Sequence, residues 1–225
     1  SKGIENKTSF FAHEIFQSVI DTDKLCVLSG PTLAREIIEG KPTLATVAAN
    51  DLEVAKKVQD SNGVYMVPAF VGLGTPYWDN DARGAIFGLT RATSKEHIVR
   101  ATLEAIAFQS KDVMEVMKEE SKLKFKSLAV DGGACANNFL MQFQSDILNC
   151  NIMRPVNLET TALGAAYLAG LATGIYKNTE EIKKLREMDR IFVPSRTLKN
   201  VEKIYSGWKQ AVASTRTFKP NRKEN

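Results

Sequence analysis

The feature that most constrains this chain is a pair of glycines between a predicted strand and a predicted helix. Residues 125–130 are predicted to form a strand, and Gly132 and Gly133 follow shortly after it. Because glycine has no Cβ, a flat ring or a phosphate can approach its backbone closely. Asn137 or Asn138 then begins a helix, whose amino-terminal dipole favours anions. The pattern predicts an α/β fold with a ligand-binding site at this junction.

The residues before the junction predict a mixture of short strands and one long helix. Residues 64–67 are predicted to form a strand, and the helical period of residues 94–118 predicts a helix with Phe108 and Met114 in the core. The segment between them, residues 69–91, is rich in glycine and aromatic residues and predicts a packed irregular loop. Its charged residues are interpreted as structural pairs rather than catalytic groups, namely Asp79, Asp81 and Arg83.

The first sixty residues carry a separate, shorter β/α pattern. Residues 25–29 and 43–49 are rich in residues that favour strands, and residues 33–39 between them predict a helix. No Gly-x-Gly-x-x-Gly follows a strand anywhere in the sequence, so the dinucleotide cradle that this motif builds is absent. We expect a small β/α appendage without a complete dinucleotide site.

The composition excludes several classes of function. It is 44% hydrophobic and 25% charged, as in ordinary globular proteins, and no apolar run approaches the roughly 18 to 20 residues that span a bilayer. The net charge is +4, and the basic residues of the carboxy-terminal tail are not interspersed with aromatic residues. This argues against nucleic-acid binding. Cys26, Cys135 and Cys150 lack CxxC spacing, so we expect reduced, buried thiols and no metal site. A cytoplasmic location is expected.

Residues 61–225 resemble the carboxy-terminal nucleotide-binding domain of glycerol kinases, members of the FGGY sugar-kinase family. The resemblance is carried by four segments, residues 76–79, 83–91, 130–148 and 159–170. It implies an actin-like (ribonuclease H-like) ATPase fold and an adenine nucleotide, ATP with Mg²⁺, as ligand. It leaves homo-oligomerisation open. By this resemblance the ATP-binding residues are Gly132, Gly133, Ala134, Asn137 and Asn138.

The same resemblance implies that the catalytic part of a kinase is missing. The catalytic Asp of the family, the residues that hold glycerol and the first phosphate loop all precede the region that is preserved here. We therefore expect neither catalytic residues nor metal ligands in this chain. Phosphoryl transfer depends on positioning and charge neutralisation, so one half of a site is expected to give no transfer.

Residues 1–60 resemble an internal fragment of NAD(P)-dependent glycerol-3-phosphate dehydrogenases. The resemblance is carried by residues 2–5, 28–34 and 51–55. It implies a remnant of the glycerol-3-phosphate and NAD(P) pocket formed by Lys2, Gly30, Thr32 and Ala34. The catalytic lysine of that family has no counterpart, so the NAD(P) site is incomplete. The two resemblances meet within residues 58–61 and predict a chimera of two parts, residues 1–60 and 61–225.

Three functions remain open from the sequence. The first is a glycerol kinase-like domain in glycerol and glycerol-3-phosphate metabolism that is inactive alone and keeps affinity for adenine nucleotides. The second is a non-catalytic interaction module, or a relic or assembly chimera. The third is an NAD(P)-dependent glycerol-3-phosphate dehydrogenase fragment. Activity as a kinase or a dehydrogenase would require a partner polypeptide that supplies the missing domain.

Overall fold

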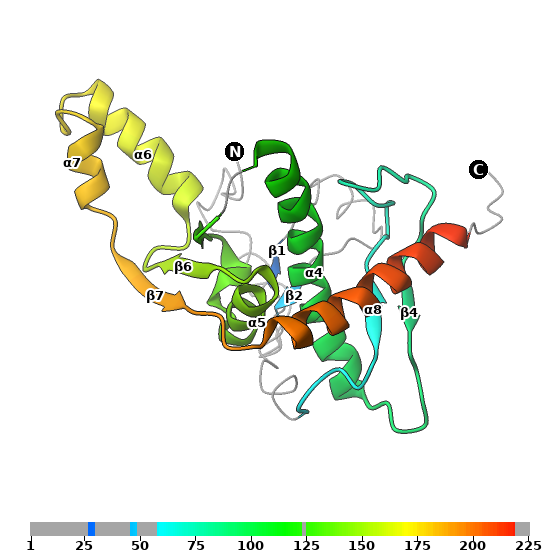
Figure 1. Ribbon diagram of the computed structural model, residues 1–225. Coiled ribbons are helices and arrows are strands. Elements are labelled where there is room, and N and C mark those ends of the chain that lie inside the picture. The colour runs from blue at the N-terminus through cyan, green and yellow to red at the C-terminus, as the bar shows by residue number, and fades with distance from the viewer. Residues whose placement is uncertain (1–26, 30–45, 49–57, 123–124, 219–225) are drawn as a thin grey trace, which may run out of the picture.

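The computed structural model describes residues 27–29, 46–48, 58–122 and 125–218. These residues form short strands and longer helices in a mixed α/β arrangement (Figure 1). None of the helices in this part of the chain is long and apolar enough to cross a membrane. The elements in chain order are β1 Val27–Ser29, β2 Thr46–Ala48, β3 Tyr65–Val67, β4 Ala85–Phe87, α4 Lys95–Ser121, β5 Ser127–Ala129, η1 Gly133–Ala136, α5 Asn138–Leu148, β6 Asn151–Pro155, α6 Thr160–Ala172, α7 Thr179–Lys184, β7 Met188–Phe192 and α8 Leu198–Thr217.

The described strands form three small sheets. The sheet that carries the glycine pair has the order β5-β6-β7, with β5 parallel and β7 antiparallel to β6. β3 pairs with β4 in an antiparallel ribbon, and β1 pairs with β2 in another. The strands expected at residues 25–29 and 43–49 are therefore present over β1 and β2, and they pair with each other. The helix expected at residues 33–39 lies outside the described residues.

The core lies where α4, α5 and α8 pack together, with β3 against α4 and α8 (Figure 1). Phe108 of α4 stacks on Trp208 of α8 with 5.3 Å between ring centroids, and it meets Phe143 of α5 edge to face at 5.5 Å. These three side chains are at most 2% exposed. Met114 is also buried, so both predicted core residues of this helix are confirmed.

A buried carboxylate holds α4 to α8 within this core. Asp112, only 3% exposed, accepts hydrogen bonds from the Tyr205 hydroxyl at 2.6 Å and the Trp208 indole at 2.8 Å. Burial raises the pKa of Asp112, against the opposing effect of hydrogen bonds from Tyr205, Trp208 and Tyr77. A buried charge is tolerated only when its lone pairs are satisfied, and here two residues more than 90 positions away satisfy them.

The start of α4 is tied to the end of the amino-terminal region. Ser94 is the N-cap, and its backbone N–H donates to His97 Nδ1 at 3.0 Å. One turn later, Arg100 pairs with Glu104 at 2.9 Å and donates to the backbone carbonyl of Val58 at 2.7 Å. Arg100 and Glu104 are both buried, so this pair fixes the predicted junction between the two parts of the chain against α4.

The segment expected to be an irregular loop contains a strand. β4 lies within residues 69–91, and its Ile86 pairs with Met66 of β3. The prediction was wrong there because only three apolar residues mark the strand, too few for an alternation to be visible. The structural interpretation of the acidic residues agrees with the contacts of Asp79, which accepts backbone hydrogen bonds from Asp81 and Ala82 and pairs with Arg216 at 3.4 Å.

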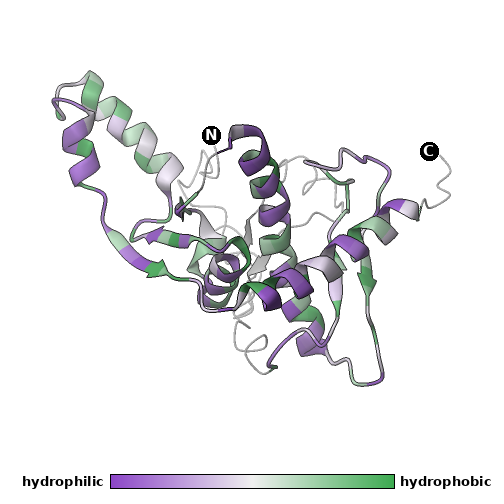
Figure 2. Ribbon diagram, viewed as in Figure 1, coloured by the Kyte–Doolittle hydropathy of each residue, from purple (hydrophilic) through white to green (hydrophobic). Residues whose placement is uncertain are grey.

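Helices α6 and α7 project away from this core as an arm (Figure 1). Gly170 is the only buried residue of α6. Figure 2 shows that α6 is largely apolar, while α7 is mostly hydrophilic. The core and the arm meet at the sheet β5-β6-β7, where the glycine pair lies.

Candidate functional site

The glycine pair forms a tight turn between β5 and η1. Gly132 has a φ of +83°, a left-handed conformation that favours glycine, and its N–H donates to the Leu158 carbonyl at 2.9 Å. Its own carbonyl accepts from the N–H of Cys135 at 3.0 Å, which closes the first turn of η1. A Cβ built on Gly132 would have no heavy atom within 4 Å. The turn therefore leaves open space beside its backbone, as the approach of a ligand requires.

A buried arginine holds η1 in place. Arg154 of β6 donates from Nη1 to the carbonyls of Cys135, at 2.8 Å, and Ala136, at 3.3 Å. Its Nε donates to Asp189 of β7 at 2.6 Å, and the residue is only 9% exposed. No role was predicted for Arg154 from the sequence. The only sequence signal was the position of Arg154 between apolar residues. Such a position indicates burial, but it does not identify the hydrogen-bond partners.

Cys135 adds a second contact within the turn. Its Sγ donates to the carbonyl of Asp131 at 2.8 Å. Burial raises the pKa of the Cys135 thiol to about 11, and the negative charge of Asp131 adds to this while Arg154 opposes it. The thiol is thus protonated at neutral pH and serves as a donor. Cys135 and Cys150 are both free and buried, as expected, whereas Cys26 lies outside the described residues.

The five predicted ATP-binding residues lie within residues 132–138, from the turn to the start of α5, but they differ in how exposed they are. The side chain of Asn137 is committed to the fold: it is 4% exposed, and its Oδ1 accepts from the N–H of Leu140 at 3.0 Å as the N-cap of α5. Gly133 and Asn138 are exposed, and Gly132 and Ala134 are partly buried. Contacts to a ligand are therefore available from Gly133 and Asn138 and from the backbone at the start of α5.

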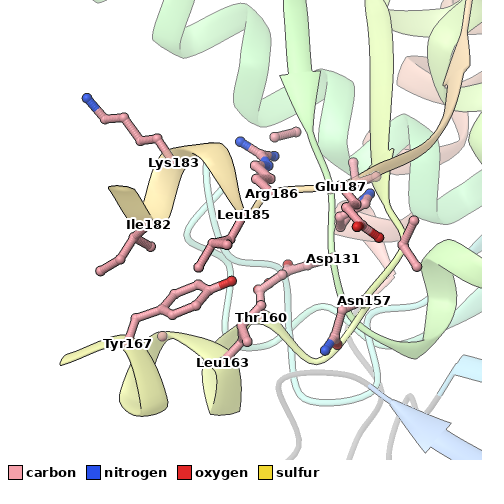
Figure 3. Close-up of a pocket in the computed structure, with 15 residues that line it drawn as sticks. Asp131, Asn157, Thr160, Leu163, Tyr167, Ile182, Lys183, Leu185, Arg186 and Glu187 are labelled. Atoms are coloured by element: carbon pink, nitrogen blue, oxygen red, sulfur yellow. The ribbon is translucent and has the colours of Figure 1, made fainter. Parts of the chain in front are cut away.

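A cavity of about 590 Å³ lies beside the turn, between the ends of β5 and β6 and the arm (Figure 3). The predicted ATP-binding residues do not line it, although their neighbour Asp131 does. Thr160, at the start of α6, donates a hydrogen bond to Asp131, and both residues line the cavity. The lining residues are Ala129, Val130, Asp131, Pro155, Val156, Asn157, Thr160, Leu163, Gly164, Tyr167, Ile182, Lys183, Leu185, Arg186 and Glu187.

The predicted dehydrogenase pocket cannot be placed. Lys2, Gly30, Thr32 and Ala34 all lie outside the described residues. The two strands of that segment that are described, β1 and β2, lie next to η1, with Cα atoms within 8 Å of it. Within the ranges that the structure describes, no group of three or more His, Cys, Asp or Glu side chains is arranged to hold a metal ion.

Comparisons with known proteins agree with the kinase-like part of the sequence analysis. The family model described as FGGY family of carbohydrate kinases, C-terminal domain, matches residues 9–173. Glycerol kinase from Bacillus cereus strain ATCC 14579 is 58% identical over 172 residues, which cover 76% of this chain and 35% of the relative. Glycerol kinase from Bacillus thuringiensis strain Al Hakam is 57% identical over the same length.

Solved structures of carbohydrate kinases also align with this chain. Plasmodium falciparum glycerol kinase with ADP aligns with a TM-score of 0.67 at 39% identity, over 73% of this chain and 33% of that one. Ligand-bound xylulose kinase from Lactobacillus acidophilus aligns with a TM-score of 0.61 at 27% identity, over 72% and 34%. These matches confirm the predicted actin-like, ribonuclease H-like fold class. The chain spans about a third of the length of the curated relatives it matches. It belongs to the FGGY family of carbohydrate kinases, and its counterpart there is the C-terminal domain.

Proposed function

We propose that this chain is a glycerol kinase-type nucleotide-binding domain that binds adenine nucleotides and transfers no phosphate by itself. One observation carries the proposal: an open glycine turn, held by Arg154 between β5 and α5, occurs in a chain that is 58% identical to a glycerol kinase. The relative solved with ADP supports the choice of ligand class. We also propose a cytoplasmic location.

The geometry of the turn suits an adenine nucleotide. Gly133 is exposed and presents backbone without a side chain, so a planar base or a ribose can lie against it. The amino-terminal N–H groups of α5 favour a negatively charged group close by. Asn138, exposed at the first position of α5, offers an amide that can both donate and accept hydrogen bonds. When Mg²⁺ accompanies the nucleotide, it neutralises phosphate charge.

The same geometry supports the expectation of inactivity. The described residues supply a binding surface from one side, and about two thirds of the length of the relatives has no counterpart in this chain. Phosphoryl transfer requires a positioned acceptor hydroxyl, a base and charge neutralisation on both sides of the transferred group. Asp131 is the carboxylate next to the turn, and it already accepts a hydrogen bond from Thr160. We therefore assign no catalytic residue.

Calorimetric titration of the purified chain with ADP, and with ATP and Mg²⁺, tests the binding. We expect saturable binding that Gly133→Val weakens at least about tenfold, equivalent to about 1.4 kcal/mol, because its side chain fills the exposed face of the turn. Gly74→Val is the matched control, since Gly74 is exposed like Gly133 and a Cβ on Gly74 meets no atom within 4 Å. Absence of binding, or equal loss in both variants, would contradict the proposal. A coupled assay for glycerol phosphorylation should show no turnover.

The chimeric origin of residues 1–60 stays a second proposal. It rests on the resemblance of residues 2–5, 28–34 and 51–55 to dehydrogenases. β1 and β2 pair with each other and, within the described residues, do not extend the sheet β5-β6-β7. The family model nevertheless begins at residue 9 and so spans most of this segment as well. A titration with NADH followed by fluorescence tests what is left of the dehydrogenase function. We expect no binding, because the dinucleotide cradle is absent; saturable binding would favour the dehydrogenase alternative.

A further inference from the structure

Strand β7 contains one residue that has no partner in its pairing with β6. The residues on either side of Asp189 lie opposite consecutive residues of β6, Arg154 and Pro155, so Asp189 is the extra residue of a β-bulge. A bulge disturbs the regular alternation of a strand and re-aims a side chain, and bulges are frequent at sheet edges and next to active sites. β7 is an edge strand of β5-β6-β7, and it runs from the arm to the core (Figure 1).

The bulge brings the carboxylate of Asp189 to the guanidinium of Arg154. Asp189 Oδ2 accepts from Arg154 Nε at 2.6 Å, which is a short charge-assisted hydrogen bond. The Asp189 side chain is 45% exposed and that of Arg154 is 11% exposed, so the carboxylate is partly solvated while the guanidinium is largely buried. Arg154 Nη1 donates in turn to the carbonyls of Cys135 and Ala136 in η1. One guanidinium therefore joins the bulge to η1.

The bond to Asp189 decides how the guanidinium is turned. Its five N–H groups lie in one rigid plane, so the direction of Nε sets the position of Nη1. Arg154 also lies over the Phe192 ring, with 5.1 Å between the guanidinium carbon and the ring centroid. Such a contact attracts the charge but does not choose which edge of the guanidinium points toward η1. Without the carboxylate, Nη1 would lose its fixed position at the two carbonyls.

The two carbonyls belong to the segment that connects the glycine turn to α5. Cys135 also donates its N–H to the carbonyl of Gly132, so a shift of η1 is passed to the turn. Binding groups that are held in place before the ligand arrives bind it more tightly, because less ordering remains to be done. We infer that Asp189 is a positioning residue of the nucleotide site, which acts through Arg154 to hold the turn and the start of α5 in the form that binds ADP. The inference rests on the proposed function.

The sign of the effect on ADP affinity tests this inference. Removal of a carboxylate near an anion-binding site strengthens binding if charge alone acts, because a repulsion is lost. The positioning role predicts the opposite, and Asp189→Ala should weaken ADP binding about fivefold in calorimetric titration. Glu187→Ala is the matched control, since it removes the same charge from an exposed residue two positions away, and it should not weaken binding. Unchanged or tighter binding in Asp189→Ala, or equal weakening in Glu187→Ala, would overturn the inference.

Two further variants separate positioning from charge. Asp189→Asn keeps an acceptor for Arg154 Nε without the charge, so it should recover part of the affinity that Asp189→Ala loses. In an Arg154→Met background, Asp189→Ala should change the ADP affinity by less than about twofold, because the group through which it acts is already gone. Equal affinities of Asp189→Asn and Asp189→Ala, or losses that add in the double variant, would contradict a role through Arg154.

Amide hydrogen exchange of the chain without nucleotide distinguishes this inference from the proposed function. The N–H groups of Cys135 and Asn137 make backbone hydrogen bonds within the turn and η1, so their exchange reports on this segment directly. Asp189→Ala should speed their exchange, and Glu187→Ala should not. If the unchanged chain binds no ADP, the proposed function fails and takes the nucleotide role of Asp189 with it, even where exchange is faster. If ADP binds the unchanged chain and Asp189→Ala equally well, the inference alone fails.

Discussion

The helical core and the arm differ in how far contacts among the described residues cover their side chains. In the core, even charged groups have partners, since Asp112 is bonded to Tyr205 and Trp208 and Glu104 to Arg100. In the arm, apolar side chains such as Leu168 are mostly exposed. The core side chains find their partners within the described residues, whereas the arm has a composition suited to contacts that the described residues do not supply.

The glycine turn lies between these two regions and depends on both. Arg154 attaches η1 to the sheet, and the hydrogen bond from Thr160 to Asp131 attaches the end of β5 to the arm. A nucleotide site on the core side can therefore be well ordered while the neighbouring cavity stays incomplete.

Trp208→Ala should cause the largest loss of stability. The side chain is fully buried and stacks on Phe108, so its removal leaves a cavity in the core. Replacement of a large buried aromatic residue by alanine costs about 3 to 5 kcal/mol. Urea denaturation measures the change. A loss below about 1 kcal/mol would show that this region is not the closed core that the contrast requires.

Asp112→Ala should cost somewhat less, because it leaves the Trp208 indole and the Tyr205 hydroxyl without their acceptor. Each buried group without a partner costs about 1 to 3 kcal/mol. Asp112→Asn keeps an acceptor at this position and should cost less than Asp112→Ala. Thermal and urea denaturation of the two variants give the ranking, and the opposite order would contradict the role assigned to the carboxylate.

Because the pKa of Asp112 is raised, the stability difference between the unchanged chain and Asp112→Asn should depend on pH. Since its folded pKa lies above the ordinary value of 3.8, the folded state holds the proton more tightly than the unfolded state. This group therefore contributes more stability below pH 3.8 and loses that contribution as the pH rises through the folded pKa. The stability of the unchanged chain minus that of Asp112→Asn should increase as the pH falls through this window. A difference that stays constant from pH 7 to pH 4 would contradict the raised pKa.

Arg154→Met should affect the nucleotide site more than the fold. It removes the donors to the Cys135 and Ala136 carbonyls while keeping much of the apolar volume of the side chain. We expect about 1 to 3 kcal/mol of lost stability and about a tenfold weaker ADP affinity. Arg190→Met is the control, because Arg190 is exposed and lies 4.7 Å over the Phe192 ring. Equal effects in both variants would leave Arg154 without a positioning role.

Leu168→Gln should have the smallest effect. The residue is 70% exposed, and exposed substitutions usually change stability by less than about 0.5 kcal/mol. Urea denaturation should therefore give the same free energy of unfolding as for the unchanged chain. A loss of stability comparable with that of Trp208→Ala would mean that α6 is already packed within the chain.

The sequence predicted the elements that depend on local pattern. The strand before Gly132, the start of α5 and the long helix were all found within a few residues of their expected positions. Each of these elements is marked by a local signal in the sequence: a glycine pair, an Asn at a helix start or a helical period. The buried positions of Phe108 and Cys135 follow from the same reasoning.

What the sequence did not predict depends on partners far away in the chain. Asp112 is buried because residues 93 and 96 positions later donate to it, and Arg154 because Asp189 and the η1 carbonyls surround it. Hydrophobic periodicity assigns such polar residues to the surface. The nucleotide contact of Asn137 stays a prediction, and its side-chain Oδ1 is the N-cap acceptor of α5, in agreement with the helix start predicted there.

The most direct test of the account is amide hydrogen exchange of the unaccompanied chain with and without ADP. The account predicts that ADP slows exchange at residues 131–138, the turn and the start of α5, and leaves α6 unchanged. Unchanged exchange at residues 131–138 under saturating ADP, or protection confined to α6 and the cavity, would contradict it.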